Sequence, residues 1–179
     1  EYIRQHLAIM DRYDPKGKVK LIVDEWGTWY DKLPGTKEGF LQQQNTLRDA
    51  LVAGINLNIF NNHADRISMA NIAQIVNVLQ SVILTKGAEM VKTPTYYVFK
   101  MYNVHQDATL VPIQIESEQY QFGGESIPAL TASASKRDGV TSITITNANP
   151  NKAISLQCQL GQGFNSVSGK IITAKDMTA

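Results

Sequence analysis

A short apolar run that ends in two carboxylates constrains the fold of this chain more than any other feature. The run covers residues 21–23 and is flanked by Lys20 and Asp24. It is too short for a helix and too apolar for an edge strand, which predicts a strand covered on both faces. Such strands belong to parallel α/β sheets and barrels, where active sites lie at the carboxyl ends of the strands. Asp24 and Glu25 are predicted to stand at such an end.

Two tryptophans, Trp26 and Trp29, follow the carboxylates and indicate a class of ligand. The C–H faces of a sugar ring stack on flat aromatic side chains, while its hydroxyls need charged or amide partners. Glu25, with these two tryptophans close by in the sequence, is therefore interpreted as part of a candidate carbohydrate site. Two simpler interpretations stay open: Glu25 could cap a helix or form an ion pair, and Trp29 could merely pack under a loop.

Hydrolysis of a glycosidic bond is the natural chemistry for such a site, and it requires two carboxyl groups that flank the bond. Asp24 is a poor second member, because adjacent residues of a strand point to opposite faces. We expect Asp24 to be a buried acid paired with a donor of a neighbouring strand. The required acid/base should then come from another strand.

The first half of the chain alternates between helical and strand patterns. Ile3, Leu7 and Met10 predict an amphipathic helix that ends near Asp14. After the first strand we expect a loop over residues 31–35, a helix that begins at Thr36, a second strand over 55–60, and a largely buried helix over 67–79. This order implies parallel strands joined by right-handed crossovers, as in an α/β barrel or an open sheet.

The pattern changes near residue 87. Residues 96–102 fit a short helix or a strand equally well. Beyond them apolar residues alternate with polar ones over 111–115, 142–146 and 154–160, which predicts antiparallel strands with one solvent-exposed face. Turn signals at Gly123-Gly124, 136–139 and 147–151 separate the strands at spacings compatible with a β-sandwich. The domain boundary is placed there, with residues 1–87 as an α/β part and 88–179 as the sandwich.

Three other residues invite a functional interpretation. Gln74 could be a satisfied core amide or a ligand donor, and the core role is expected. His63 is expected to be structural, because only Asp65 accompanies it, and we predict neither a metal site nor a cofactor. The single cysteine, Cys158, cannot form an internal disulfide and is expected to be a small buried hydrophobe in a strand.

The charge composition limits the classes of binding partner that we expect. The formal net charge is +1 and no run of like charges occurs, so neither nucleic acid nor a membrane surface is an expected partner, and the ligand should be neutral. No stretch approaches the roughly 18 apolar residues of a membrane helix, and the N-terminus carries no signal-peptide pattern. The chain opens in a helical pattern without methionine, so it looks like a piece of something longer.

Three blocks of sequence, residues 23–30, 62–66 and 69–78, together resemble the C-terminal half of the α-L-arabinofuranosidases of glycoside hydrolase family 51. The resemblance implies a (β/α)8 barrel, whose C-terminal part would be residues 1–87, followed by a jelly-roll β-sandwich in 88–179. It also implies a retaining enzyme that removes α-L-arabinofuranosyl groups from arabinan, arabinoxylan or their oligosaccharides.

The resemblance assigns roles to individual residues. Glu25 would be the catalytic nucleophile, Trp29 would line the sugar pocket, and Gln74 would contact the arabinose, which replaces the core role expected above. The family's acid/base glutamate lies upstream and has no counterpart here, so the isolated chain is predicted to be inactive and to pair with the remainder of the enzyme. Family members commonly form hexamers, so a homo-oligomer is a further expectation.

Two rival functions stay open at this point. The first is another retaining glycosidase of the same barrel clan, acting on xylose- or glucose-type sugars. The second is a non-catalytic sugar-binding protein that kept the aromatic site.

Overall fold

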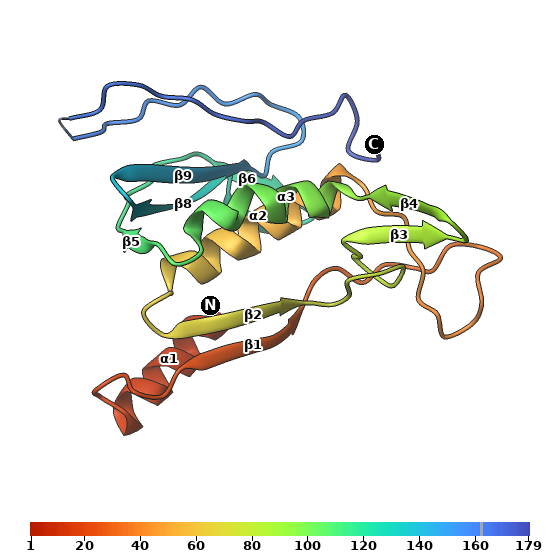
Figure 1. Ribbon diagram of the computed structural model, residues 1–179, viewed down its shortest axis with the longest axis horizontal. Helices are drawn as coiled ribbons and strands as arrows, with labels where there is room; N and C mark the ends of the chain where they lie inside the picture. The colour runs from red at the N-terminus through yellow and green to blue at the C-terminus, as the bar shows by residue number, and fades with distance from the viewer. Residues whose placement is uncertain (162) are drawn as a thin grey trace.

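The computed structural model describes residues 1–161 and 163–179 and stacks the chain in layers (Figure 1). A parallel strand pair with α1 beside it forms one side, two helices form the middle, and a three-stranded sheet covers the helices on the other side. In chain order the elements are α1 (Tyr2–Tyr13), β1 (Leu21–Trp26), α2 (Leu47–Asn62), β2 (Ile67–Ile72), β3 (Ile83–Lys86), β4 (Glu89–Lys92), α3 (Pro94–Tyr102), the 3-10 helix η1 (Asn103–His105), β5 (Thr109–Val111), β6 (Gln119–Phe122), β7 (Glu125–Pro128), β8 (Leu130–Arg137) and β9 (Val140–Asn147).

The middle layer holds the apolar core. Helix α2 begins after Thr46, whose backbone N–H donates to Asp49 Oδ2 at 2.7 Å, an interaction that satisfies a free donor at the helix start. The core consists of Trp26, Leu47, Ala50, Ala53, Phe60, Ile67 and Val98. The Trp26 ring meets Phe60 edge-on, with centroids 5.5 Å apart, and stacks on Phe99 at 6.0 Å. None of the helices described is long and apolar enough to cross a membrane.

Two predicted elements of the first half are wrong. Residues 55–60 belong to α2 and not to a strand, and the helix begins at Leu47 rather than near Thr36. Residues 67–79 are not a helix: β2 covers Ile67–Ile72 and the chain then continues without regular structure to β3. The first error arises because α2 is covered on two sides and so loses the amphipathic period that marks a helix.

Parallel strands joined by a helix are observed, as predicted, but the second strand is β2 and not residues 55–60: β1 pairs with β2 in parallel and α2 makes the crossover. Burial on both faces is not observed. Leu21 and Val23 pack against the core, whereas Ile22 is 51% exposed and Met69 of β2 is 53% exposed. No element described in 1–161 or 163–179 covers that second face, so the pair has one buried side only.

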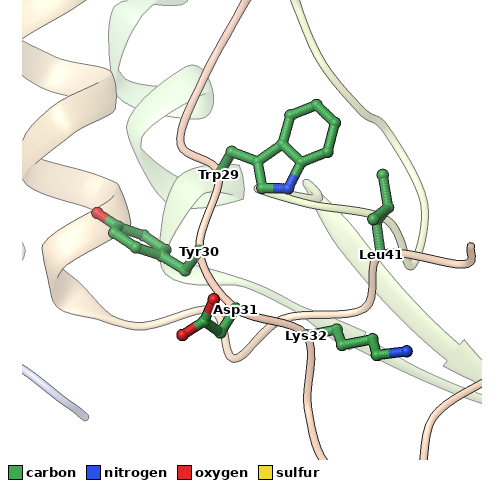
Figure 2. Close-up of a pocket in the computed structure, with 5 residues that line it drawn as sticks. All are labelled: Trp29, Tyr30, Asp31, Lys32 and Leu41. Atoms are coloured by element: carbon green, nitrogen blue, oxygen red, sulfur yellow. The ribbon is translucent and has the colours of Figure 1, made fainter. Parts of the chain in front are cut away.

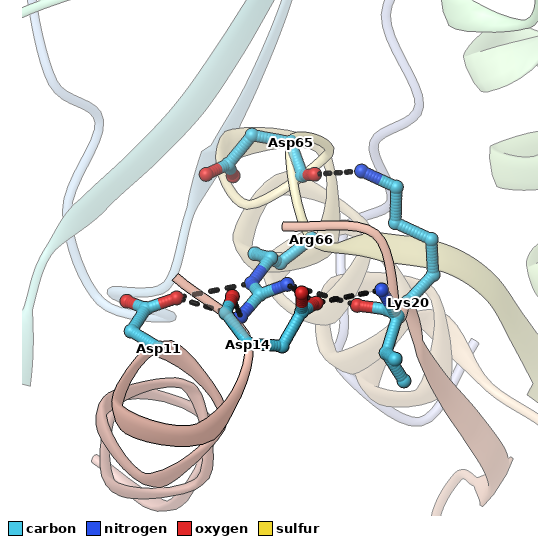
Figure 3. Close-up of polar contacts among 6 residues, drawn as sticks. Asp11, Asp14, Lys20, Asp65 and Arg66 are labelled. Carbon is cyan, nitrogen blue, oxygen red and sulfur yellow. Dashed lines mark hydrogen bonds and ion pairs between the residues drawn. The ribbon is translucent and has the colours of Figure 1, made fainter. Parts of the chain in front are cut away.

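A buried arginine ties α1 to the strand pair (Figure 3). The Arg66 guanidinium donates to Asp11 Oδ1 at 2.7 Å and to Asp14 Oδ2 at 3.0 Å, and its Nη1 also reaches the Val19 carbonyl at 2.9 Å. The Val19 backbone N–H and then Arg66 lower the pKa of Asp14, and the bond to Asp14 raises the pKa of Arg66. The predicted end of the first helix near Asp14 is therefore confirmed, with this cluster fixing the turn into β1.

The second half is antiparallel, as predicted, but its strands are fewer. Strands β5, β8 and β9 form one sheet, while β3–β4 and β6–β7 are separate hairpins. The predicted turns at Gly123-Gly124 and 136–139 connect β6 to β7 and β8 to β9. Of the two structures open for 96–102, the helix is observed: α3 starts with Pro94 at its first turn, after Thr93.

The predicted strand at 154–160 is wrong. These residues lie outside any strand, in the segment that follows β9 (Figure 1). Cys158 is consequently exposed and not buried. Alternation alone does not make a strand, because each strand needs a partner for its backbone hydrogen bonds, and none of the described strands pairs with this segment. Likewise β5 stops at Val111, before Ile113 and Ile115.

The three-stranded sheet turns a hydroxyl-rich face toward α2. Asn58 of α2 is fully buried, and its Oδ1 accepts bonds from Ser133, Thr144 and Tyr102, each at 2.9 Å. Its Nδ2 donates to Thr131 at 3.1 Å.

The predicted boundary at residue 87 falls in the turn between β3 and β4, and the division into two domains stays a prediction.

Candidate active site

The carboxyl ends of β1 and β2 lie side by side and bring two of the predicted site residues to one edge. Trp26 pairs with Ile72, and the Ala73 backbone N–H donates to the Trp26 carbonyl at 2.8 Å. Glu25 immediately precedes Trp26, and Gln74 follows Ala73; both side chains are exposed. Because parallel strands end at the same edge of a sheet, Glu25 and Gln74 share that edge.

A register shift breaks the alternation of β1 at this edge. Val23 pairs with Ala70 and Trp26 pairs with Ile72, so three steps along β1 match two steps along β2. Val23 and Trp26 both contact the apolar core, and the extra residue lies between them. Such irregularities re-aim side chains next to functional sites. The simple rule that separated Asp24 from Glu25 therefore does not hold here.

Two neighbours of Glu25 differ from expectation. Asp24 is exposed, so the prediction of a buried, paired acid is wrong, because the face of β1 that was expected to be covered is open. Trp26 is buried in the core beneath Phe60 and Phe99, so it packs the fold and offers no face to a sugar. Of the two tryptophans, only Trp29 remains available to a ligand.

Trp29 lies on the loop that follows β1 and is 69% exposed. With Tyr30, Asp31, Lys32 and Leu41 it lines an open hollow of about 400 Å³. Figure 2 shows the Trp29 ring on the same side of the loop as Leu41, while Tyr30 points the other way, toward the helix layer. The Tyr30 ring lies under the Arg48 guanidinium, 3.5 Å from its carbon to the ring centroid.

The chain turns from β1 into this loop at Gly27. Its φ of +149° is rarely adopted by residues with a side chain, and a Cβ there would come within 3.2 Å of the Ala73 carbonyl oxygen. The loop thus passes close to the end of β2. The hollow at Trp29 is nevertheless lined by neither Glu25 nor Gln74 among the described residues. The catalytic role of Glu25 and the binding roles of Trp29 and Gln74 stay predictions.

Sequence reasoning missed the polar side chains that support this loop. Gln43, Asp49 and Gln80 are buried, and Asp49 and Gln80 have no exposed surface at all. They bond to Thr28 and Tyr30, on either side of Trp29. Gln43 stands in a run of three glutamines and Gln80 is followed by the polar Ser81, so the neighbours of neither residue in the sequence mark it.

His63 plays no visible part at this edge. His63 caps the end of α2, where its N–H donates to the Phe60 carbonyl at 3.0 Å. Gln74 lies in irregular chain after β2 rather than in the predicted helix. No group of three or more histidine, cysteine, aspartate or glutamate residues in the described chain could hold a metal ion.

Comparison with known proteins assigns the family. A sequence model described as the alpha-L-arabinofuranosidase C-terminal domain matches residues 24–179. The chain belongs to this family. The resemblance to the C-terminal part of family 51 arabinofuranosidases is thereby confirmed.

Individual relatives agree with this assignment. The chain is 50% identical, over 99% of its length and 35% of the relative's, to a Bacteroides ovatus protein named intracellular exo-alpha-L-arabinofuranosidase. An intracellular exo-alpha-(1->5)-L-arabinofuranosidase of Halalkalibacterium halodurans is 26% identical over the whole chain and 39% of its own length. The chain also resembles the crystal structure of the GH51 arabinofuranosidase from Xanthomonas axonopodis pv. citri, with 58% sequence identity and a TM-score of 0.81. The match covers 84% of this chain and 31% of that one. The chain spans little more than a third of the curated relatives' length.

Proposed function

We propose that this chain is the C-terminal part of a retaining glycoside hydrolase that removes α-L-arabinofuranosyl groups from arabinan- or arabinoxylan-type saccharides. The observation that carries the proposal is the 50% identity, over 99% of the chain, to a protein named an exo-alpha-L-arabinofuranosidase. The exposed carboxylate of Glu25 at the end of β1 supports it, because such a reaction needs a carboxyl group. The exposed ring of Trp29 on the following loop supports it as well, because a sugar ring can stack on such a face.

In the proposed mechanism Glu25 is the nucleophile. Its carboxylate attacks the anomeric carbon and forms a glycosyl ester as the bond to the leaving oxygen breaks. A second carboxyl group, about 5 Å away, gives its proton to that oxygen and then takes a proton from the water that hydrolyses the ester. This acid/base would come from the part of the enzyme outside this chain, so the isolated chain should show no turnover.

The binding residues complete the proposal. Gln74 shares its sheet edge with Glu25 and carries both a donor and an acceptor, which suits the hydroxyls of a bound arabinose. Trp29 would offer its face to the C–H side of a sugar. The exposed Ile22 and Met69 favour a covering partner for the open face of β1–β2, which we propose to be the rest of a (β/α)8 barrel in the same enzyme. The strands after β4 would belong to its β-sandwich.

A panel of 4-nitrophenyl glycosides tests the substrate class on the full-length protein. We expect nitrophenol release from the α-L-arabinofuranoside and little from the corresponding xylo- and glucopyranosides, because a furanoside pocket discriminates against six-membered rings. Equal or greater release from a pyranoside would favour the rival glycosidase. A folded protein that binds arabino-oligosaccharides but cleaves none of these substrates would favour the sugar-binding function.

A further inference from the structure

Two buried glutamines bind the backbone on either side of Trp29. The Thr28 backbone N–H donates to Gln80 Oε1 at 3.0 Å, and the Tyr30 backbone N–H donates to Gln43 Oε1 at 2.9 Å. The two glutamines come from different parts of the chain, Gln43 from the segment before α2 and Gln80 from the irregular segment after β2. The backbone N–H groups of both residues next to Trp29 are therefore held by side chains.

The same side chains are linked into a closed network. Gln43 Nε2 donates to Thr28 Oγ1 at 3.2 Å, and this hydroxyl donates to Asp49 Oδ1 at 2.7 Å. Gln80 Nε2 donates to the Asp49 carbonyl at 2.7 Å and to Thr95 Oγ1 at 3.2 Å. Buried polar groups that satisfy one another in this way fix a single arrangement, because breaking any bond leaves a buried group without a partner.

The loop has no regular secondary structure of its own. Residues 27–46 form neither helix nor strand, and the Trp29 ring is mostly in solvent, so its own packing does not fix its place. An amide suits the task, because it supplies an acceptor and a donor without charge. A carboxylate at position 43 or 80 would supply no donor and would bury a charge.

We propose that Gln43 and Gln80 are positioning residues for a sugar subsite at Trp29. They act through the backbone of Thr28 and Tyr30, and Asp49 joins them to the start of α2. The inference rests on the proposed function, since it needs Trp29 to contact the substrate. A misplaced contact of about 1 Å is enough to cost an enzyme on the order of 100-fold in rate, which sets the scale of the expected effect.

A double-mutant cycle in the full-length protein separates positioning from general support. With 4-nitrophenyl α-L-arabinofuranoside, Gln43→Leu should lower kcat/KM by about 10- to 100-fold. In a Trp29→Ala background the same substitution should lower it no further, because its effect passes through Trp29. Gln44→Leu, at an exposed neighbour in the same glutamine run, is the control and should leave kcat/KM unchanged. Falls that multiply in the double mutant would overturn the inference.

A second readout does not depend on the substrate. Hydrogen exchange at the Thr28 and Tyr30 amides should be slow in the wild type and fast at Tyr30 in Gln43→Leu, while exchange in the core of α2 is unchanged. If Gln43→Leu does not fold, Thr28→Val replaces it, with Thr28→Ser as the variant that restores activity. Fast wild-type exchange at both amides would overturn the inference. A wild type without arabinofuranosidase activity would instead overturn the proposed function, and the subsite with it.

Discussion

Helix α2 meets two very different surfaces. Toward β1, β2 and α3 it presents Ala50, Ala53 and Phe60, which join an apolar core around Trp26. Toward β8 and β9 it presents asparagines, whose amides bond to a row of hydroxyls and to the Ala132 carbonyl. On this side Gly54 packs so closely on Thr146 that a Cβ would overlap the threonine hydroxyl. One helix thus binds one layer by burial and the other by hydrogen bonds.

The two sides of α2 join their layers in different ways. Apolar contact is not directional and tolerates small shifts, whereas the bonds at Asn58 require particular hydroxyls to face particular atoms. The apolar side should therefore supply most of the stability, and the polar side should set the register between helix and sheet. Each side can be tested with a substitution on α2 in the full-length protein.

The largest effect is expected on the apolar side. Phe60→Ala should lower the free energy of unfolding by about 3–5 kcal/mol, because it removes a buried ring that packs edge-on against Trp26 and leaves a cavity. Urea unfolding measures the change. Ile59→Ala is the matched control at the neighbouring, 37% exposed position, and its loss should be much smaller. Equal losses at the two positions would contradict the division between the faces.

A smaller loss is expected on the polar side. Asn58→Ala should cost about 2–3 kcal/mol, because it removes the buried acceptor that the hydroxyls of Ser133, Thr144 and Tyr102 share. Asn58→Leu restores volume without the acceptor and should not recover the loss. Asn56→Ala, which removes only a bond to the Val52 carbonyl, should cost a few tenths of a kcal/mol. Recovery of wild-type stability in Asn58→Leu would show that volume, not hydrogen bonding, holds this side.

The smallest effect concerns His105, which extends the polar side. Its ring nitrogens contact Ser135 Oγ at 2.7 Å and Thr144 Oγ1 at 2.9 Å, and burial lowers its pKa. The pKa of His105 is lower in the folded state than the value near 6.5 in the unfolded state. The stability that neutral His105 contributes is therefore fully present above pH 6.5 and is lost as the pH falls through the pKa of the folded state. Unfolding followed between about pH 7.5 and 5 should show this loss in the wild type and less of it in His105→Gln. Identical pH profiles would contradict the assignment.

The sequence predicted the parts of the fold that depend on local signals. The end of α1 near Asp14, the strand at residues 21–23 and the turns at Gly123 and Gly139 are marked by glycine, proline or apolar residues close by. Helix α2 was missed in its second half because it is buried on both sides. Residues 55–60 alternate in hydrophobicity, and Asn58 faces a sheet that lies far along the chain.

In the candidate site, too, local features could be predicted from the sequence and features that depend on distant contacts could not. Glu25 stood out because an acid follows a buried strand, and its place at the end of β1 is observed. The register shift beside it depends on pairing with β2, which the residues of β1 alone do not encode. Gln43 and Gln80 lie far apart in the chain and meet only through Thr28 and Asp49, so no spacing rule could have selected them.

Nitrophenol release by Glu25→Ala in the full-length protein tests the proposed nucleophile most directly. With 4-nitrophenyl α-L-arabinofuranoside the variant should lose activity by at least about 10³-fold while its melting temperature stays close to that of the wild type. Added azide should restore release, because a small anion can occupy the emptied space and attack the anomeric carbon in place of the carboxylate. Glu38→Gln, at an exposed loop position, should remain fully active. A folded Glu25→Ala protein with activity near that of the wild type would contradict the account.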